Sequence, residues 1–387
     1  MANTVEQSSD RFLSLDVFRG MTICFMIIVN NPGGDVSFSP LDHAHWFGFT
    51  PTDLVFPSFL FAMGNAMSFS MKKFIGQSDL SVFLRILKRS ALIFLVAYCL
   101  EMLGSVHHDI NGGWSIGSFS HMRILGVLPR IALCYLFAGL MVYFIKSKNV
   151  VIAIGILFLI GYWAILRFFG DPTNHFGMLT NVGTTLDKLV LGENHMYHGE
   201  TDWTGKGIAF DPEGILSTIP SIVNVICGYY AGKFIQEKGK AYEMISKLLL
   251  FGFLFIFLAL CWNMSFPIAK KLWTSSFVLL TVGIDLVLIS ALVYVVEMKE
   301  RGNDAWVSFF NTFGKNPLAI YVFGDFFGAV VGWFYINKMN FNELIDVKVF
   351  LAIAPGAIGS LLFAIYYMMV CWVFGKILDK RKIYIRV

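Results

Sequence analysis

The sequence predicts an all-α, polytopic integral membrane protein with about ten transmembrane helices. Its 387 residues are 56% hydrophobic and only 14% charged, and the mean hydropathy is +0.66. Soluble domains carry about 25% charged residues, so this chain cannot cover itself with a polar surface. Apolar runs such as 150–168 and 248–261 approach the roughly 20 residues that cross a bilayer core.

The apolar runs define the expected topology of a single domain over residues 1–387. Spans are expected near 15–31, 52–72, 83–103, 124–145, 150–169, 214–235, 246–264, 273–296, 315–336 and 350–376, with a short re-entrant or interfacial helix at 304–313. Residues 1–12 are polar, and no small-residue cleavage site follows the first run. That run is therefore expected to stay in the membrane.

The positions of Lys and Arg predict the orientation. They gather in alternate loops and in the C-terminal tail, which places both termini in the cytoplasm. The outward loop 32–51 has none, and the longest outward loop, 170–213, has two lysines against seven acidic residues. Lys270 and Lys271 are the exception, because they lie in a short outward loop.

Under this topology all eight histidines lie outside or at the outer ends of spans. The segment from His43 to Asp53 stands out, because His43, His45, Trp46 and Asp53 directly precede a span. Histidine transfers protons near neutral pH, so His43 fits a general base or a transient nucleophile. A metal site is the alternative for the histidine pair, but third and fourth ligands at suitable spacing are missing. We therefore expect no metal.

The six cysteines lie in apolar segments and include no C-x-x-C pair. We expect buried, unpaired thiols rather than a disulfide framework or a zinc site.

Five charged residues fall within or at the edges of expected spans: Asp16, Arg19, Arg130, Asp285 and Lys315. Such groups cost at least about 2.5 kcal/mol in hydrocarbon, so they face a partner or a wet cavity. Asp16 and Arg19 are three residues apart on one helix face, which fits either a structural ion pair or a ligand site.

Two polar segments mark span ends. Asn30 and Asn31 precede Pro-Gly-Gly, which breaks the helix and leaves a carboxamide either to cap it or to orient a carbonyl or an amine. Asp211, Pro212 and Glu213 have helix-capping chemistry. The polar stripe that follows fits a cavity wall or helix–helix hydrogen bonding; its members are Ser217, Thr218, Ser221 and Asn224.

Taken together, these motifs resemble the catalytic domain of the heparan-alpha-glucosaminide N-acetyltransferase family. The matching segments are Leu15-Asp-Val-Phe-Arg-Gly20, Val29-Asn30 with Gly33-Gly34, His43-Ala-x-Trp46 through Asp53-Leu-Val-Phe-Pro57, Gly126-Val-Leu-x-Arg130, Asp211-Pro-Glu-Gly, Pro267-x-x-Lys270-x-Leu-Trp273 and Gly314-x-Asn316. They run in order from residue 15 to about 320. The His-Ala-x-Trp block and Asp-Pro-Glu-Gly are the specific ones.

The resemblance implies transfer of an acetyl group from cytosolic acetyl-CoA to the amine of a glucosamine-type sugar on the far side. It assigns His43 and Asn30 to catalysis. Three departures bear on the acceptor and the site: about two extra residues between Asn30 and His43, so that Asn31 is the alternative carboxamide, His45 in place of a small polar residue, and no large lumenal N-terminal portion.

The residues fit this reaction, since amide formation needs a base for the amine and a donor to the oxyanion. We expect Asp16, Arg19 and Arg130 to bind the CoA. The expected substrate-binding residues are Asn31, Trp46, Asp53, Asp211, Glu213 and Lys270. Direct transfer and an acetyl-histidine intermediate both remain open, as does a homodimer. We expect a bacterial inner membrane protein that binds no nucleic acid.

Two other functions fit the same residues. A sugar or amino-sugar transporter would use buried charges along its path and His43 to couple protons. A membrane O-acyltransferase would act on an envelope glycan.

Overall fold

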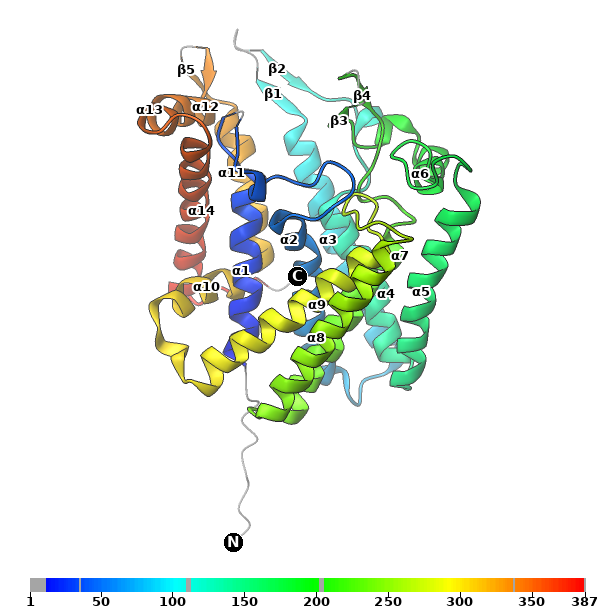
Figure 1. Cartoon of the computed structure of the whole chain (residues 1–387). Coiled ribbons are helices and arrows are strands. Elements are labelled where there is room, and N and C mark those ends of the chain that lie inside the picture. The colour runs from blue at the N-terminus through cyan, green and yellow to red at the C-terminus, as the bar shows by residue number, and fades with distance from the viewer. Residues whose placement is uncertain (1–11, 35, 109–112, 202–204, 337, 386–387) are drawn as a thin grey trace.

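The structure is a computed structural model that describes residues 12–34, 36–108, 113–201, 205–336 and 338–385, and this part of the chain is predominantly helical (Figure 1). Seven of the described helical segments are long and apolar enough to cross a membrane. They comprise α1 (Leu13–Asn30), α2 (Pro51–Ser70) with η2 (Met71–Phe74), α4 (Val127–Phe144), α5 (Lys148–Phe169), α8 (Tyr242–Asn263), α9 (Ser275–Leu292) with η5 (Val293–Met298), and α14 (Ala357–Lys380). The all-α, polytopic class is therefore confirmed.

The remaining three expected spans also coincide with helices, but these do not meet the same criteria. They are α3 (Asp79–Gly104), α7 (Thr218–Lys238) and α11 (Pro317–Gly332). Charged side chains along α3 and polar ones along α7 lower their hydropathy, and α11 has only 16 residues. The short helix expected at 304–313 is α10 (Ala305–Lys315). Ten spans thus remain a prediction.

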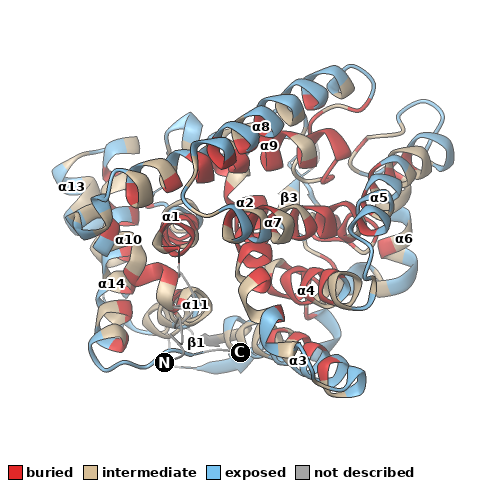
Figure 2. Ribbon diagram, turned by 90° about the horizontal axis from the view of Figure 1, so that it is seen from below, coloured by how far each residue is buried: buried red, intermediate tan, exposed pale blue. Residues whose placement is uncertain are grey.

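The core lies where α1, α2, α7 and α9 meet, while α5 and α8 lie at the periphery (Figure 2). Apolar side chains such as Phe253 and Phe257 on α8 point outward, as expected for helices that face lipid. All six cysteines are unpaired. Three of them are buried, but Cys99 and Cys261 are exposed on the outer faces of α3 and α8, so the expectation of burial is wrong for these two.

Glycines let the central helices approach closely. A Cβ at Gly64 of α2 would lie 2.1 Å from the carbonyl oxygen of Val225, and one at Gly228 of α7 would lie 2.0 Å from that of Phe61. Gly252 and Gly283 make the same kind of contact between α8 and α9. Small residues at helix crossings are a common packing solution in membranes, where apolar burial alone does not drive association.

The polar stripe on α7 is buried against other helices. Asn224 Nδ2 donates to Thr281 Oγ1 of α9 at 3.1 Å, and the Ser221 hydroxyl bonds to the backbone of its own helix. The stripe was expected either to line a cavity or to form hydrogen bonds between helices. These contacts fit the second alternative.

One end of the bundle carries three short hairpins and the helix α6, and we call it the hairpin end (Figure 1). The elements there are η1 (Ser39–Leu41), β1 (Val106–His108), β2 (Trp114–Ile116), η3 (Phe119–His121), α6 (Val182–Leu191), η4 (Glu193–His195), β3 (Glu200–Thr201), β4 (Gly207–Ile208), β5 (Tyr335–Ile336), β6 (Met339–Asn340), α12 (Phe341–Ile345), η7 (Asp346–Phe350) and α13 (Leu351–Ile353). All eight histidines lie in connections at this end. That it faces outward remains a prediction.

Candidate active site

Asp53 organises the segment that carries His43. It is the third residue of α2, where it completes a capping box with Thr50. Its Oδ2 accepts the backbone N–H groups of Thr50 at 3.0 Å and Ala44 at 3.2 Å. These bonds satisfy N–H groups at the helix start and fold the preceding loop back over it. The Asp53 side chain is fully buried.

The other oxygen of Asp53 holds His43. His43 Nδ1 lies 2.7 Å from Asp53 Oδ1, and the His43 side chain is 38% exposed. Because a carboxylate only accepts hydrogen bonds, Nδ1 must carry the proton. In the neutral ring this leaves the lone pair on Nε2, the nitrogen that can take a proton from a reactant. The pair has the geometry of a general base and its orienting carboxylate.

Lys270 is the second partner of His43. Its Nζ lies 3.0 Å from Nε2 and 3.3 Å from Nδ1. We call His43, Asp53 and Lys270 the His43 cluster. Lys270 reaches it from the loop between α8 and α9, which is bound to the His43 loop because Gly48 N–H donates to the Ile268 carbonyl at 2.8 Å.

The backbone around Lys270 is tightly constrained. Trp273 N–H donates to the Lys270 carbonyl at 2.9 Å, and Trp273 adopts a left-handed conformation with φ of 52°. The indole is fully buried and its Nε1 donates to Asn224 Oδ1 at 3.2 Å. A bulky residue in this conformation persists only when its surroundings over-determine it, as they do here.

A second charged group, the Arg123 cluster, comprises Arg123, Arg130, Asp211 and Glu213. Arg123 donates to both oxygens of Asp211, at 3.0 and 2.6 Å, and to Glu213 Oε2 at 2.6 Å. Both carboxylates are buried. Burial alone would raise the pKa of Glu213, but the neighbouring Arg123 and Arg130 hold it below its usual value. The same carboxylates raise the pKa of Arg123 although burial opposes its charge.

Arg130 is the deepest member of this cluster. It is fully buried in the first turns of α4, and its Nη2 donates to the Gly214 carbonyl at 3.1 Å and to the Ser217 hydroxyl. Its guanidinium lies 4.9 Å from the centre of the Trp273 ring. Within the described structure its Nε and Nη1 have no hydrogen-bond partner.

The two clusters interact through Lys270. Burial lowers the pKa of the Lys270 ammonium, and Lys271 and Arg130 lower it further, against the opposing attraction of Glu213 and Asp53. The neighbouring Lys271 has its own partner, because its Nζ lies 2.7 Å from Glu200 Oε2. The two outward lysines that the charge pattern leaves unexplained thus have carboxylate or histidine partners.

The other expected substrate-binding side chains have structural contacts. The Trp46 indole N–H donates to the Phe176 carbonyl at 2.8 Å, and its ring packs edge-on against Phe210 at 5.3 Å. Asn31 Nδ2 donates to the Ile27 carbonyl at 2.8 Å. Asn30 ends α1 with an exposed side chain. Among the described contacts, none joins Asn30 to His43.

The three residues expected to bind CoA do not lie together. Arg19 Nη2 is 2.6 Å from Asp16 Oδ1, and Arg19 Nε donates to the Gly314 carbonyl of α10 at 2.9 Å. These contacts lie at the end opposite the hairpins, whereas Arg130 belongs to the hairpin end (Figure 1). The Asp16–Arg19 contacts fit the structural ion pair.

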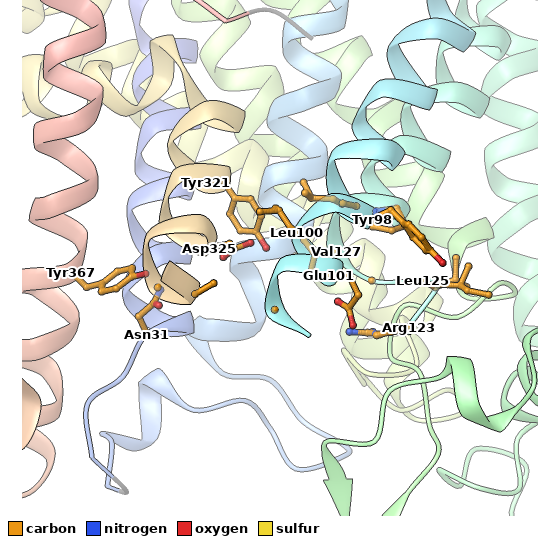
Figure 3. Close-up of a pocket in the computed structure, with 18 residues that line it drawn as sticks. Asn31, Tyr98, Leu100, Glu101, Arg123, Leu125, Val127, Tyr321, Asp325 and Tyr367 are labelled. Carbon is orange, nitrogen blue, oxygen red and sulfur yellow. The ribbon is translucent and has the colours of Figure 1, made fainter. Parts of the chain in front are cut away.

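A cavity of about 440 Å³ opens between α3, α4 and α11, close to the Arg123 cluster (Figure 3). Tyr321 and Asp325 come from α11, and Glu101 from α3. Arg123 lines the cavity and also binds the two buried carboxylates. Asn31, Tyr98 and Tyr367 complete its polar lining.

Sequence reasoning did not single out Arg123, Glu101 or Asp325. An ionisable residue within an apolar helix is a recognisable signal for Asp325, and a lone arginine in an outward loop poor in basic residues is one for Arg123. Within the described part of the chain, no group of three or more His, Cys, Asp or Glu residues is arranged to hold a metal ion.

Comparison with known proteins gives two relatives. The chain is 29% identical over 367 residues to the heparan-alpha-glucosaminide N-acetyltransferase of Mus musculus, an alignment that covers 82% of this chain and 54% of the relative. It is also 29% identical over 358 residues to the human protein of the same name, covering 81% and 52%. The chain thus spans about half the length of these curated relatives. No family model matches it.

Proposed function

We propose that this chain, which belongs to the heparan-alpha-glucosaminide N-acetyltransferase family, transfers the acetyl group of acetyl-CoA to the amine of a glucosamine-type sugar. The His43–Asp53 pair is the observation that carries the proposal, because it joins an oriented base to a partly exposed position at the hairpin end. The motifs that resemble the family include His43 and the residues around it. The reaction takes place within the membrane domain, with the hairpin end facing outward.

His43 removes the proton that the acceptor amine loses as it becomes an amide. The amine nitrogen attacks the thioester carbonyl carbon, the C–N bond forms, and the C–S bond breaks as the tetrahedral intermediate collapses. The ammonium form of the acceptor first releases one proton to solvent. The second proton passes from nitrogen to His43 Nε2 and then to the departing thiolate. Asp53 keeps the ring in the required tautomer and stabilises the imidazolium, in the way a carboxylate supports histidine in hydrolase triads.

The developing negative charge on the carbonyl oxygen needs a hydrogen-bond donor. Asn30 is assigned this role by the family resemblance. Its exposed carboxamide supports that choice over Asn31, because the Asn31 amide already donates to the Ile27 carbonyl. Asn30 and His43 must therefore approach each other when substrates bind.

The two substrates reach His43 from different ends. Acetyl-CoA enters from the end opposite the hairpins, where Lys72 and Lys73 lie in η2 and Arg85, Lys88 and Arg89 in the first half of α3. Such cations suit the phosphates of CoA. The acceptor arrives at the hairpin end, where carboxylates such as Glu101 and Asp325 at the cavity suit a cationic sugar.

The direct test is a transfer assay with radiolabelled acetyl-CoA and a panel of amino sugars, using the purified full chain. We expect label on glucosamine-type acceptors and thermal stabilisation by CoA or acetyl-CoA. His43→Ala is expected to abolish transfer while the stabilisation by CoA persists. The proposal is overturned if the folded protein shows no thermal shift with CoA or acetyl-CoA and also yields no labelled sugar.

A further inference from the structure

The contact between Lys270 and His43 is not explained by the reaction as described above. A primary amine, Lys270 Nζ, lies 3.0 Å from the nitrogen of His43 that is left to accept a proton. A general base acts within about 2.6–3.2 Å of the group that it deprotonates, and Nζ meets this distance to Nε2 while it also lies 3.3 Å from Nδ1. The protein therefore already places an amine of its own at the base.

We propose that Lys270 occupies the position of the acceptor amine and that it becomes acetylated when acetyl-CoA is bound without an acceptor. This inference rests on the proposed acetyl transfer. It adds a covalent modification site in the loop between α8 and α9, and an internal competitor for the sugar. The acceptor must displace Lys270 from His43 before its own amine can react.

The chemistry is the same as for the sugar, so no further reactant is needed. The ammonium of Lys270 first loses a proton to solvent through His43. Its nitrogen then attacks the thioester carbonyl, the new C–N bond forms, and the C–S bond breaks. The second proton passes through His43 to the thiolate. The products are an Nε-acetyl-lysine, free CoA thiol and one proton released to solvent.

Charge and burial favour Lys270 over other lysines as the nucleophile. It is half-buried, and the groups that act on it are His43, Asp53, Glu213, Lys271 and Arg130. Burial lowers the pKa of its ammonium below the usual value, so that a larger fraction is the neutral, nucleophilic amine. Lys271 and Arg130 lower this pKa further, while Glu213 and Asp53 oppose the shift.

Lys271 provides an internal control on the same peptide. Its ammonium is held by Glu200 at 2.7 Å, and both side chains are less than one-fifth exposed. Because the ion pair also makes Lys271 the less reactive amine, the comparison of the two lysines is read together with His43→Asn and with added acceptor, which separate acetylation at the site from acetylation in solution.

Acetylation of Lys270 would change the site lastingly. The amide is neutral, so the cation next to His43 disappears, and the added acetyl group remains beside the base. We expect the modified chain to transfer acetyl groups to external amines more slowly. A high concentration of acceptor protects against this loss, because the acceptor and Lys270 compete for the same nitrogen of His43.

The test incubates the full purified chain with isotope-labelled acetyl-CoA, digests it with a protease that does not cut at lysine, and measures labelled acetyl at Lys270 and Lys271 by mass spectrometry. We expect Lys270 to carry at least roughly tenfold more label than Lys271, because proximity to His43 raises the effective concentration of its amine. Glucosamine added with the donor should suppress this label severalfold. His43→Asn should bring Lys270 down to the level of Lys271, whereas Lys271→Arg should leave the Lys270 label in place.

The outcomes separate this inference from the proposed function. Acetylated sugar with equal or no label on the two lysines leaves the function standing and overturns the inference. Label on neither sugar nor lysine overturns both. Preferential label on Lys270 that persists in folded His43→Asn, or that glucosamine does not suppress, shows chemical acetylation independent of the site and also overturns the inference. The experiment with added glucosamine uses the unaltered chain, so it tests the inference even if His43→Asn does not fold.

Discussion

The His43 cluster and the Arg123 cluster are neighbours at the hairpin end, yet they use the same kinds of charged groups differently. In the Arg123 cluster, two buried carboxylates share one guanidinium through short, direct hydrogen bonds. In the His43 cluster the carboxylate is buried, but the histidine that it holds is 38% exposed, and among the described residues the hydrogen-bond partner of its Nε2 is Lys270. The first arrangement joins loops, and the second leaves a reactive nitrogen accessible.

This difference predicts different consequences of mutation. Changes in the His43 cluster should reduce turnover and leave the fold intact, because the exposed ring contributes little burial. Changes in the Arg123 cluster should reduce stability first, because an unpaired charge would remain in a buried place. Each of the following variants tests one side of the comparison.

His43→Ala is expected to have the largest effect. Loss of a general base lowers the rate by about 10²- to 10⁴-fold, and here we expect the upper part of that range because the amine must lose a proton for turnover. The measurement is acetyl transfer by protein whose thermal unfolding matches the unaltered chain. His45→Ala is the matched control, an exposed histidine two residues away, and should retain most activity. Comparable losses in both variants would contradict the assignment of His43.

Arg123→Gln is expected to lower the free energy of unfolding by about 3–5 kcal/mol, because the change leaves Asp211 and Glu213 buried without their main cation. Thermal unfolding in detergent measures the loss. Arg167→Gln, an exposed arginine on α5, should change stability by no more than about 0.5 kcal/mol. A stable Arg123→Gln protein with strongly reduced transfer would instead place Arg123 in the reaction.

Asp53→Asn tests how the base is oriented. The carboxamide can still cap α2, but it no longer fixes the ring proton on Nδ1 or stabilises the imidazolium. We expect transfer to fall about 10²- to 10³-fold with little change in unfolding temperature. Asp42→Asn, an exposed change in the same loop, is the control. A loss of stability that accounts for the loss of transfer would make Asp53 a structural residue only.

Much of this arrangement could be anticipated from local sequence. The ten apolar or amphipathic stretches coincide with helices, because span length and composition are properties of consecutive residues. Both His43 and Asp53 were singled out from the sequence, because they lie in one short segment directly before a span. His43 was expected as a base, whereas Asp53 was expected to bind substrate. That Asp53 orients His43 was not predictable, because the hydrogen bond between them depends on how Ala44 and Thr50 fold the loop back onto Asp53.

Contacts distant in sequence could not be predicted. Lys270 is 227 residues from His43, and Arg123 is 88 residues from Asp211. Both pairings depend on how the outer loops pack together, for example through the hydrogen bond between Gly48 and Ile268. The hydrophobic pattern of the sequence does not predict this packing. The expected topology already put Asp16 and Arg19 at the inner end of the first span and Arg130 near the outer end of the fourth, so their grouping as one CoA site conflicted with that topology.

Asp187→Asn is expected to have the smallest effect, and it tests whether a carboxyl buried near the Arg123 cluster destabilises the fold when it is charged. Burial raises the pKa of Asp187 from its usual 3.8 to about 6, and Asp211 adds to this against the Ile215 amide and Arg130. The folded chain therefore binds this proton more tightly than the unfolded chain. The stability contributed by protonation is present below pH 4 and is lost as the pH rises through 6.

Replacing Asp187 with asparagine removes this pH-dependent loss. Between pH 4 and 7 the free energy of unfolding of the variant should rise above that of the unaltered chain, by at most about 3 kcal/mol. Thermal unfolding across that range measures this difference. Asp171→Asn is the control of opposite sign, because hydrogen bonds from Thr173 lower the pKa of Asp171, so its contribution is lost as the pH falls. If the difference in stability between Asp187→Asn and the unaltered chain were constant with pH, the pKa of Asp187 would be the same in the folded and unfolded chains, which would contradict the raised pKa.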